Sequence, residues 1–565
     1  MKRAMTFGGI VLALALMMPI LGASAQEEGE TDDARETREW TVMIYVGADS
    51  GFYENDDGQI AEFTLKQLRK ALIDPYESTA VSLEEMDIHL VVMVDTLGTS
   101  GTYIYDAESL AQDPTNDDFD YLPEVAPAAP EKDSSDPETL RWFVDYALTN
   151  YPAEKNLLFI KNGHAWCGVC PDVNLGDLTV SETRPETTMM SINDIAGVLG
   201  SFKKADGTRN AIDILTFDGD NMASFEAAYE LRKSIDFFVG SQQDVPLDGF
   251  AYYLSLSKLI KLSQGEEVVA PRWMSAEIAG DFVFYYNNTD GKKVLLPHLL
   301  SNSQIAVTAS SFQMVSEDGV DNLKLMADKF MDIIRYMLYG LYPDGNGGYI
   351  QCDDTEWAGE DYEGVLEAPL WDWVPYHRNA IASARDFALI GKMADQAGYE
   401  WLPDVQSWVH MLQAYMSVYA VDYGWPEDPK FCELAMDFKD VFNSSRVSMI
   451  QCQLLNRSGN SDPNGLNIWF PQNWLHWEDL DMTRTRSYAY DGFGSNVDIP
   501  REYYCVDCPL NYSECGFDFI SDYAALATEK SPHTELWIQF YDIYYDARWL
   551  IYSSDSGQDK PQTSR

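Results

Sequence analysis

The sequence of 565 residues contains 91 acidic and only 39 basic side chains, which gives a formal net charge of −52 at pH 7. This charge argues against nucleic acid as a partner, because carboxylates repel phosphates. Hydrophobic residues make up 46% of the chain and aromatic residues 13%, which is the composition of a folded protein with a large core and not of a disordered one.

The first 25 residues have the three parts of a secretory signal. Lys2 and Arg3 supply the positive start, residues 7–22 form an apolar stretch, and Ala23-Ser24-Ala25 is a small-residue cleavage motif. We therefore expect an exported protein, either secreted or held at the cell surface, with no membrane span after cleavage. The alternative is an uncleaved anchor, although the apolar stretch is shorter than the ~20 residues that cross a bilayer.

Residues 26–38 are polar and acidic and predict a disordered leader. Short apolar runs and helical patterns then alternate through residues 39–260, which predicts βαβ units and a parallel sheet. The apolar runs are nearly continuous, as in strands covered by helices on both faces. The predicted strands are residues 41–48, 88–94, 157–160, 212–217 and 235–240, and the predicted helices are residues 60–73, 140–148, 192–202 and 223–233.

The remainder, residues 261–552, predicts a helix-rich C-terminal region, followed by a polar tail at 553–565. The stretch from Tyr253 to about residue 297 has an irregular pattern. The expected elements beyond it are helices at residues 323–341, 379–397 and 534–552, and a strand at residues 465–471.

Eight cysteines in an exported chain favour disulfides. Cys167 with Cys170, and Cys505 with Cys508, have CxxC spacing and are the candidate pairs. A zinc site made from these four thiols is the alternative. Four Asn-x-Ser/Thr sequences, at Asn287, Asn443, Asn456 and Asn511, are compatible with an exterior location.

Polar residues follow two of the predicted strands, where ligands of parallel sheets usually bind. Residues 161–166 (KNGHAW) follow one strand, and residues 218–223 (DGDNMA) follow another. These segments resemble the clostripain family of cysteine peptidases, relatives of caspases, gingipains and legumains. The resemblance is carried by the stretches WTVMIYVGAD, MVDTLG, LLFIKNGHAW, FDGDNMASFEAAYELRKSIDFFVGSQQDVPLDGFAYY and GLNIWFP. The resemblance implies a caspase-like three-layer α/β/α sandwich with a mostly parallel sheet, followed by a helix-rich region of the same family.

The resemblance also assigns the catalytic positions. The family's His, which lies four residues before a Trp, falls on Asn162, and the family's Cys, which lies two residues before a Met, falls on Asp220. A cysteine peptidase needs a thiolate and a group that exchanges protons. Asn162 cannot accept a proton, and a carboxylate is a poor nucleophile toward an amide. His164 is the candidate for a shifted base, with Cys167 nearby, or else His164 is an ordinary loop side chain.

Asp218 matches the family residue that lines the pocket for a basic substrate side chain, so the resemblance implies a site for Arg or Lys, with which carboxylates pair well. The alternative is a helix cap, a role for which Asp220 is better placed. Asp218 and Asp220 together are also a candidate pair for a hard cation such as Ca²⁺, although two carboxylates are few ligands.

Two function hypotheses follow. The first is a pseudopeptidase that keeps the fold and binds a peptide or protein ligand, with Arg or Lys as the expected anchor. The second is a working hydrolase that cleaves after Arg or Lys with a relocated nucleophile or with metal assistance. A purely structural role is a third alternative, and the sequence does not set the oligomeric state.

Overall fold

The computed structural model describes residues 35–48, 57–73, 82–96, 102–111, 132–163, 168–173, 187–243, 245–246, 248–265, 268–287, 307–351, 373–389, 402–422, 429–451, 463–468, 470 and 540. The predicted signal, most of the leader and the polar tail lie outside these ranges. So does the predicted helix 534–552, apart from Phe540. The expectations for these segments stay predictions.

In the described part of the chain, ten strands form one sheet whose main path runs β12-β9-β8-β7-β4-β1-β2-β3. Its centre is parallel and consists of β8 (Phe237–Gly240), β7 (Ile214–Gly219), β4 (Ala153–Gly163), β1 (Arg38–Ala48) and β2 (Ile88–Thr96). These are the five strands that the sequence predicts, and their continuous apolar runs are buried, as expected for strands covered on both faces.

Antiparallel strands that the sequence did not predict extend the sheet on both sides. On one side β3 (Thr102–Asp106) pairs with β2. On the other, β9 (Thr308–Gln313) pairs with β8, and β12 (Arg446–Gln451) pairs with β9. A hairpin of β5 (Gly168–Val173) and β6 (Thr187–Ser191) attaches to the end of β4. These strands are short and mostly polar or mixed, so they carry little periodic signal.

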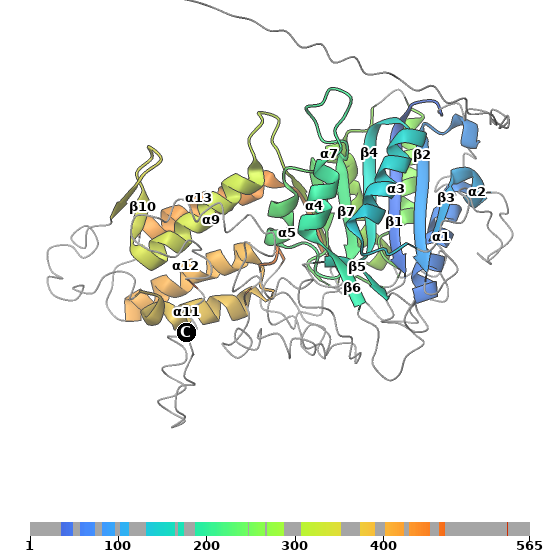
Figure 1. The fold of residues 1–565 in the computed structure, drawn as a ribbon. Coiled ribbons are helices and arrows are strands. Elements are labelled where there is room, and N and C mark those ends of the chain that lie inside the picture. Colours follow the sequence, from blue (N-terminus) through green and yellow to red (C-terminus); the bar gives the residue numbers. More distant parts are fainter. Residues whose placement is uncertain are drawn as a thin grey trace, which may run out of the picture.

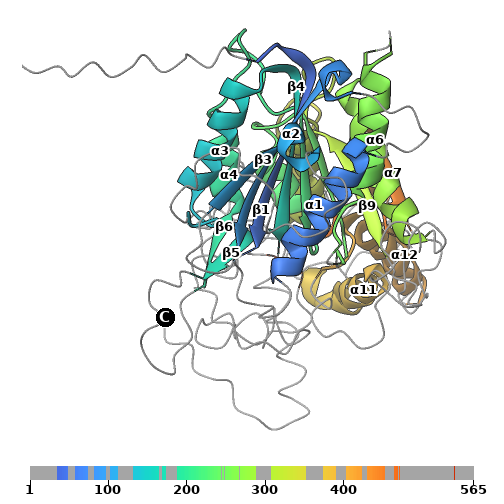
Figure 2. The ribbon, with the colours of Figure 1, turned by 90° about the vertical axis from the view of Figure 1, so that its right-hand side faces the viewer.

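Helices cover the sheet on both faces, which completes the expected three-layer sandwich (Figure 2). One face packs against α1 (Asp57–Ile73), α6 (Tyr252–Ser263) and α7 (Pro271–Asn287), and the other against α3 (Pro137–Asn150), α4 (Ile192–Gly200) and α5 (Phe225–Leu231). The short helices η1 (Leu83–Glu85) and α2 (Ala107–Ala111) lie near β2 and β3. Successive residues of β1 alternate between the two cores: Val42 and Ile44 join one, Met43 and Tyr45 the other.

The prediction of an irregular stretch after Tyr253 is wrong, because α6 and α7 occupy it. Helix α6 is buried on almost all sides, and α7 exposes the large apolar side chains Trp273 and Phe284. Apolar residues therefore occur around both helices, which hides the one-sided pattern of a surface helix.

A group of longer helices lies beyond one end of the sheet (Figure 1). It contains α9 (Asn322–Tyr339), α11 (Trp373–Ala388), α12 (Val405–Asp422) and α13 (Pro429–Ser445), with a small hairpin of β10 (Leu341–Pro343) and β11 (Tyr349–Gln351). Helices predicted at 323–341 and 379–397 correspond to α9 and α11, although α11 begins and ends earlier.

This helix group and the sandwich share one hydrophobic core. Phe330 of α9 contacts Phe225 of α5 edge to face, with ring centroids 5.8 Å apart, and also contacts Trp408 of α12. Strands β9 and β12, from the predicted C-terminal region, complete the sheet of the N-terminal region. The boundary placed at residue 260 falls inside α6, and the two regions are joined through both sheet and core.

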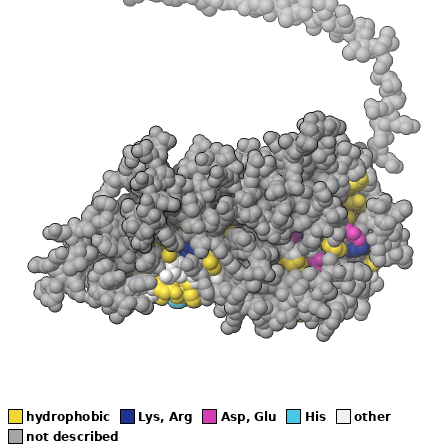
Figure 3. Space-filling model, turned by 90° about the horizontal axis from the view of Figure 1, so that it is seen from below, with side chains coloured by type: hydrophobic (Ala, Val, Ile, Leu, Met, Phe, Trp, Pro, Cys, Tyr) yellow, Lys and Arg dark blue, Asp and Glu magenta, His cyan; other side chains and the backbone are white. Residues whose placement is uncertain are grey.

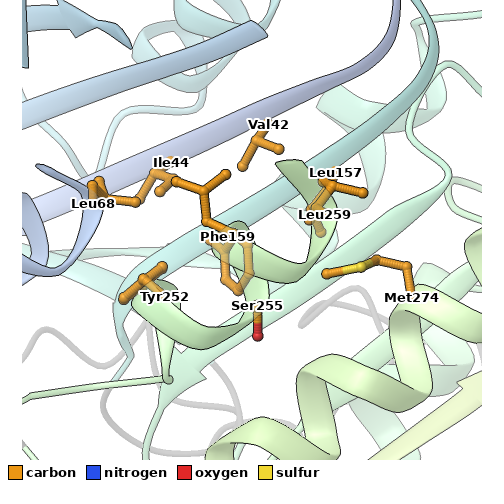
Figure 4. A pocket seen from close by; sticks show the side chains of 10 residues that line it. Val42, Ile44, Leu68, Leu157, Phe159, Tyr252, Ser255, Leu259 and Met274 are labelled. Carbon is orange, nitrogen blue, oxygen red and sulfur yellow. The ribbon is translucent and has the colours of Figure 1, made fainter. Parts of the chain in front are cut away.

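One small apolar cavity lies between the sheet and the layer of α1, α6 and α7 (Figure 4). Side chains such as Val42, Phe159 and Leu259 line it, and its volume is about 10 Å³. A cavity of this size holds at most about one water molecule, so it is a packing gap and not a ligand site. In the described residues no helix is both long enough and apolar enough to cross a membrane.

Candidate functional site

The two positions that the sequence singles out lie on neighbouring strand ends. Strands β4 and β7 pair in parallel, with Lys161 opposite Asp218 and Gly163 opposite Gly219, and the register is irregular between Lys161 and Gly163. Asn162 is the residue at this irregularity, and Asp220 directly follows β7. Their backbones thus meet at the same edge of the sheet, although the side chain of Asn162 lies outside the described part of the structure.

Asp218 is buried, with 3% of its surface exposed, and is surrounded by donors. Its Oδ2 accepts hydrogen bonds from Lys161 Nζ at 3.0 Å, from the backbone N–H of Phe250 at 3.1 Å and from the Tyr252 hydroxyl at 2.6 Å. Burial and the neighbouring Asp218 carboxylate raise the pKa of Tyr252 far above its usual value, so the phenol keeps its proton. The carboxylate at the predicted Arg/Lys position is therefore already paired with a cation of the same chain.

Asp220 is half-buried and makes a different contact. One carboxylate oxygen accepts the backbone N–H of Val245 at 2.7 Å. Burial raises the pKa of Asp220 to about 7, the negative charge of Asp218 adds to this rise, and the Val245 N–H and the Lys161 ammonium oppose it. A Ca²⁺ ion held by Asp218 and Asp220 would have to displace the Lys161 ammonium. No group of three or more potential metal ligands gathers within the described ranges.

The turn after Asp220 leads directly into α5. Asn221 has a left-handed backbone (φ +56°), which Asn tolerates better than most residues. Ser224 is the N-cap, and its Oγ accepts the N–H of Ala227 at 3.0 Å. The alternative of a helix cap at Asp218 or Asp220 is therefore wrong, because the chain needs this extra turn before the helix begins.

The late segment 464–468 is fastened to the back of this turn. The N–H of Phe225 donates to the carbonyl of Asn467 at 2.7 Å, and the N–H of Asn467 donates to the carbonyl of Ala223 at 2.8 Å. The expected strand at 465–471 is thus reduced to isolated bridges, from Asn467 to Ser224 and to Asp404. These contacts join the late segment to the strand-end turn.

A buried polar network anchors the same segment. Gln242, just beyond β8, donates from Nε2 to Asp404 at 2.9 Å and to Asn467 at 3.0 Å. Asp404 also accepts the N–H groups of Ser407 and Asn464, at 2.7 and 2.6 Å, and the Asn464 amide at 3.0 Å. Sequence reasoning did not find Gln242, Asp404, Lys161 or Tyr252. The available signal was Lys161, a charged residue at the end of an apolar strand.

Cys170 is a buried free thiol in the part of the chain that the structure describes. It sits against Gly47 and donates to the carbonyl of Lys161 at 3.5 Å. Burial raises the pKa of the Cys170 thiol well above its usual value, so it is not a reactive thiolate. The proposed Cys167–Cys170 disulfide is not formed in this structure. Cys167, His164, Cys505 and Cys508 lie outside the described residues, so the other cysteine pairing and the shifted base remain predictions.

The parallel strands end at the lower edge of the sheet in Figures 1 and 2, and Figure 3 views the molecule from that side. The described side chains on this face form small patches of hydrophobic, acidic and basic residues. The Lys161–Asp218 pair is beneath this surface, because 4% and 1% of the two side chains are exposed.

Comparison with solved structures returns peptidases. A secreted C11 cysteine protease from Bacteroides thetaiotaomicron in complex with an irreversible peptide inhibitor aligns with a TM-score of 0.45 and 14% identity, over 82% of this chain and 99% of that chain. An inactive zymogen C11 protease from Parabacteroides distasonis aligns with a TM-score of 0.40 and 16% identity, over 78% and 93% of the two chains. A search of curated proteins found no match.

The match to a protein-family model establishes the family. The model of Peptidase_C11, the clostripain family, matches residues 56–368, which is more than half of the chain and includes both strand ends described above. This protein belongs to the clostripain family.

Proposed function

We propose that this protein is an exported pseudopeptidase, a member of the clostripain family that keeps the fold but does not cleave peptides at the family site. The observation that carries the proposal is Asp220. By the resemblance to the family, Asp220 is expected at the nucleophile position, and one oxygen of its carboxyl group accepts the Val245 N–H. A carboxylate attacks an amide poorly, and Asn162 at the position of the base cannot take up a proton.

Two observations oppose the alternative of a working hydrolase. Cys170, the described thiol near the site, is buried and holds its proton. Asp220 has a pKa near 7 and could exchange protons, but peptide hydrolysis by carboxyl groups normally uses two that share one proton. Asp218 does not suit that role, because Lys161, Tyr252 and Phe250 all donate to its Oδ2.

A peptide or protein partner remains part of the proposal. Export is supported by the signal-like residues 1–25. An Arg or Lys side chain on Asp218, the expected anchor, would have to displace the Lys161 ammonium from the carboxylate. The partner's recognition is therefore expected to depend on other groups at this edge of the sheet.

Purified protein without residues 1–25 should show no turnover of Arg or Lys ester and amide reporters above the buffer rate, with or without Ca²⁺ and a thiol. Loss of catalytic dyad members typically lowers rates by about 10⁴-fold or more. Asn162→Ala and Asp220→Ala serve as matched controls and should give the same background as the parent protein.

Turnover by the parent that disappears in either variant would show that the family site is active and the proposal wrong. Turnover that survives both substitutions would place a nucleophile elsewhere and would also contradict a pseudopeptidase.

A further inference from the structure

The Lys161–Asp218 pair has the geometry of a cation site with its ligand in place. Three donors converge on Oδ2 of Asp218, and one of them is an ammonium group carried on the neighbouring strand. The Nζ of Lys161 also lies 5.7 Å from the centre of the Tyr252 ring, within the range of a cation–π contact. A carboxylate, a phenol and an aromatic face are groups that bind an alkylammonium ion.

The backbone seals this site. Gly249 has φ +72°, and a Cβ at this position would collide with both the Asp218 carboxylate and the Lys161 ammonium. The main chain therefore passes directly over the ion pair, and only glycine permits this approach. Tyr286 holds the loop by donating its hydroxyl proton to the carbonyl of Gly249 at 2.8 Å.

One oxygen of the carboxylate remains for a second contact. Oδ1 of Asp218 is buried and has no hydrogen-bond partner among the described residues. The ammonium group of a lysine acts as a point charge and donates here to one carboxylate oxygen, whereas a guanidinium group can donate to both oxygens of a carboxylate. Lys161 thus neutralises the charge of Asp218 and leaves Oδ1 of this carboxylate as an unused acceptor.

We propose that Lys161 is an internal ligand that occupies the cation site of Asp218, so that the unmodified protein accepts no external ammonium or guanidinium group there. This inference rests on the proposed function, because the ligand that Lys161 excludes is a peptide with an Arg or Lys side chain. Lys161 is then the residue that determines specificity at the Asp218 carboxylate. Shortening Lys161 should leave a cavity that fits a primary alkylammonium ion.

The test is chemical rescue of Lys161→Ala, measured by stability and not by turnover. The variant should unfold at a lower temperature than the parent, because it leaves a buried carboxylate without its cation. Adding n-propylammonium chloride, which matches the three carbons and the ammonium group that the substitution removes, up to 100 mM should raise the midpoint of the variant by about 1–2 °C, as expected for a ligand that binds only the folded state. The parent protein should not respond.

Two controls separate specific binding from general effects. 1-Propanol has a similar shape but no charge and should not rescue Lys161→Ala. The double variant Lys161→Ala/Asp218→Asn has no carboxylate to neutralise and should not respond to the amine. If Lys161→Ala does not fold alone, its refolding from urea should be recovered by the amine and not by the alcohol.

Equal response of the parent and the variant, or rescue that is independent of Asp218, would overturn the proposal, as would failure of the amine to rescue either stability or refolding. None of these outcomes depends on catalysis. A peptidase assay that contradicted the proposed function would leave the amine result to be judged separately.

Discussion

Asp404→Ala should lower the free energy of unfolding by about 4 kcal/mol, because it removes the acceptor at the centre of a buried network. Both oxygens of Asp404 are used: Oδ1 by the Ser407 N–H and the Asn464 amide, Oδ2 by Gln242 and the Asn464 N–H. The substitution leaves these donors unsatisfied in a site where Asp404 and Gln242 are almost completely buried. It also removes the N-cap of α12.

Urea unfolding, followed by fluorescence of the buried tryptophans, measures this effect. Asp404→Asn should lower the free energy of unfolding less than Asp404→Ala, because the remaining amide oxygen still accepts hydrogen bonds. It should still destabilise the protein, because the new NH₂ group faces N–H donors. Asp206→Ala is the matched control: Asp206 also accepts N–H groups in a turn, from Thr208 and Arg209, but at an exposed position. An Asp404→Ala protein as stable as the Asp206→Ala protein would show that the network does not hold the C-terminal segment.

Stability should also fall as the pH rises from about 4 to about 7. Burial raises the pKa of Asp172 and Asp220 to about 7, and of Asp236 and Asp281 to about 6. In each case the unfolded chain loses its proton first, near pH 4, so the folded state binds more protons across this range and is disfavoured as the pH increases. We expect a net loss of several kcal/mol between pH 4.5 and pH 8, since each unit of pKa difference corresponds to about 1.4 kcal/mol.

One group acts in the opposite direction within this window. Burial lowers the pKa of His89 to about 4, so its contribution is lost as the pH falls below about 6.5. Four carboxyl groups should outweigh this single imidazole. Asp206 acts in the same direction as His89 below pH 4, because hydrogen bonds from Thr208 and Arg209 hold its pKa below the usual value.

Urea midpoints at pH 4.5, 6 and 8 check this expectation. Repulsion among the exposed carboxylates of this acidic chain also grows with pH, but salt screens it. The comparison should therefore be made at both 0.15 M and 1 M salt, where the contribution of the buried groups persists. Asp220→Asn should make the curve flatter. A midpoint that rises from pH 4.5 to pH 8 at high salt would contradict the assignment of these carboxyls as buried acids.

The parallel part of the fold could be predicted because its signal is local. Each central strand is an apolar run such as residues 88–94, each crossover has a helical pattern, and parallel strands joined by crossovers place their carboxyl ends at one edge. That reasoning brought Asn162 and Asp220 to neighbouring strand ends. The short strands β9 and β12 and the buried helices α6 and α7 were missed because they lack a one-sided apolar pattern.

By itself the sequence determined the central sheet and the clostripain family, since these depend on residue order and composition along short segments. It predicts that Asn162 and Asp220 stand at the catalytic positions of that family. Only the tertiary structure decided that Lys161 pairs with Asp218 and that Gln242 joins Asp404 and Asn467. These partners are 57, 162 and 225 residues apart in the chain. No local pattern records such a pairing, because it is the packing of distant elements that removes these groups from water and makes each the partner of the other.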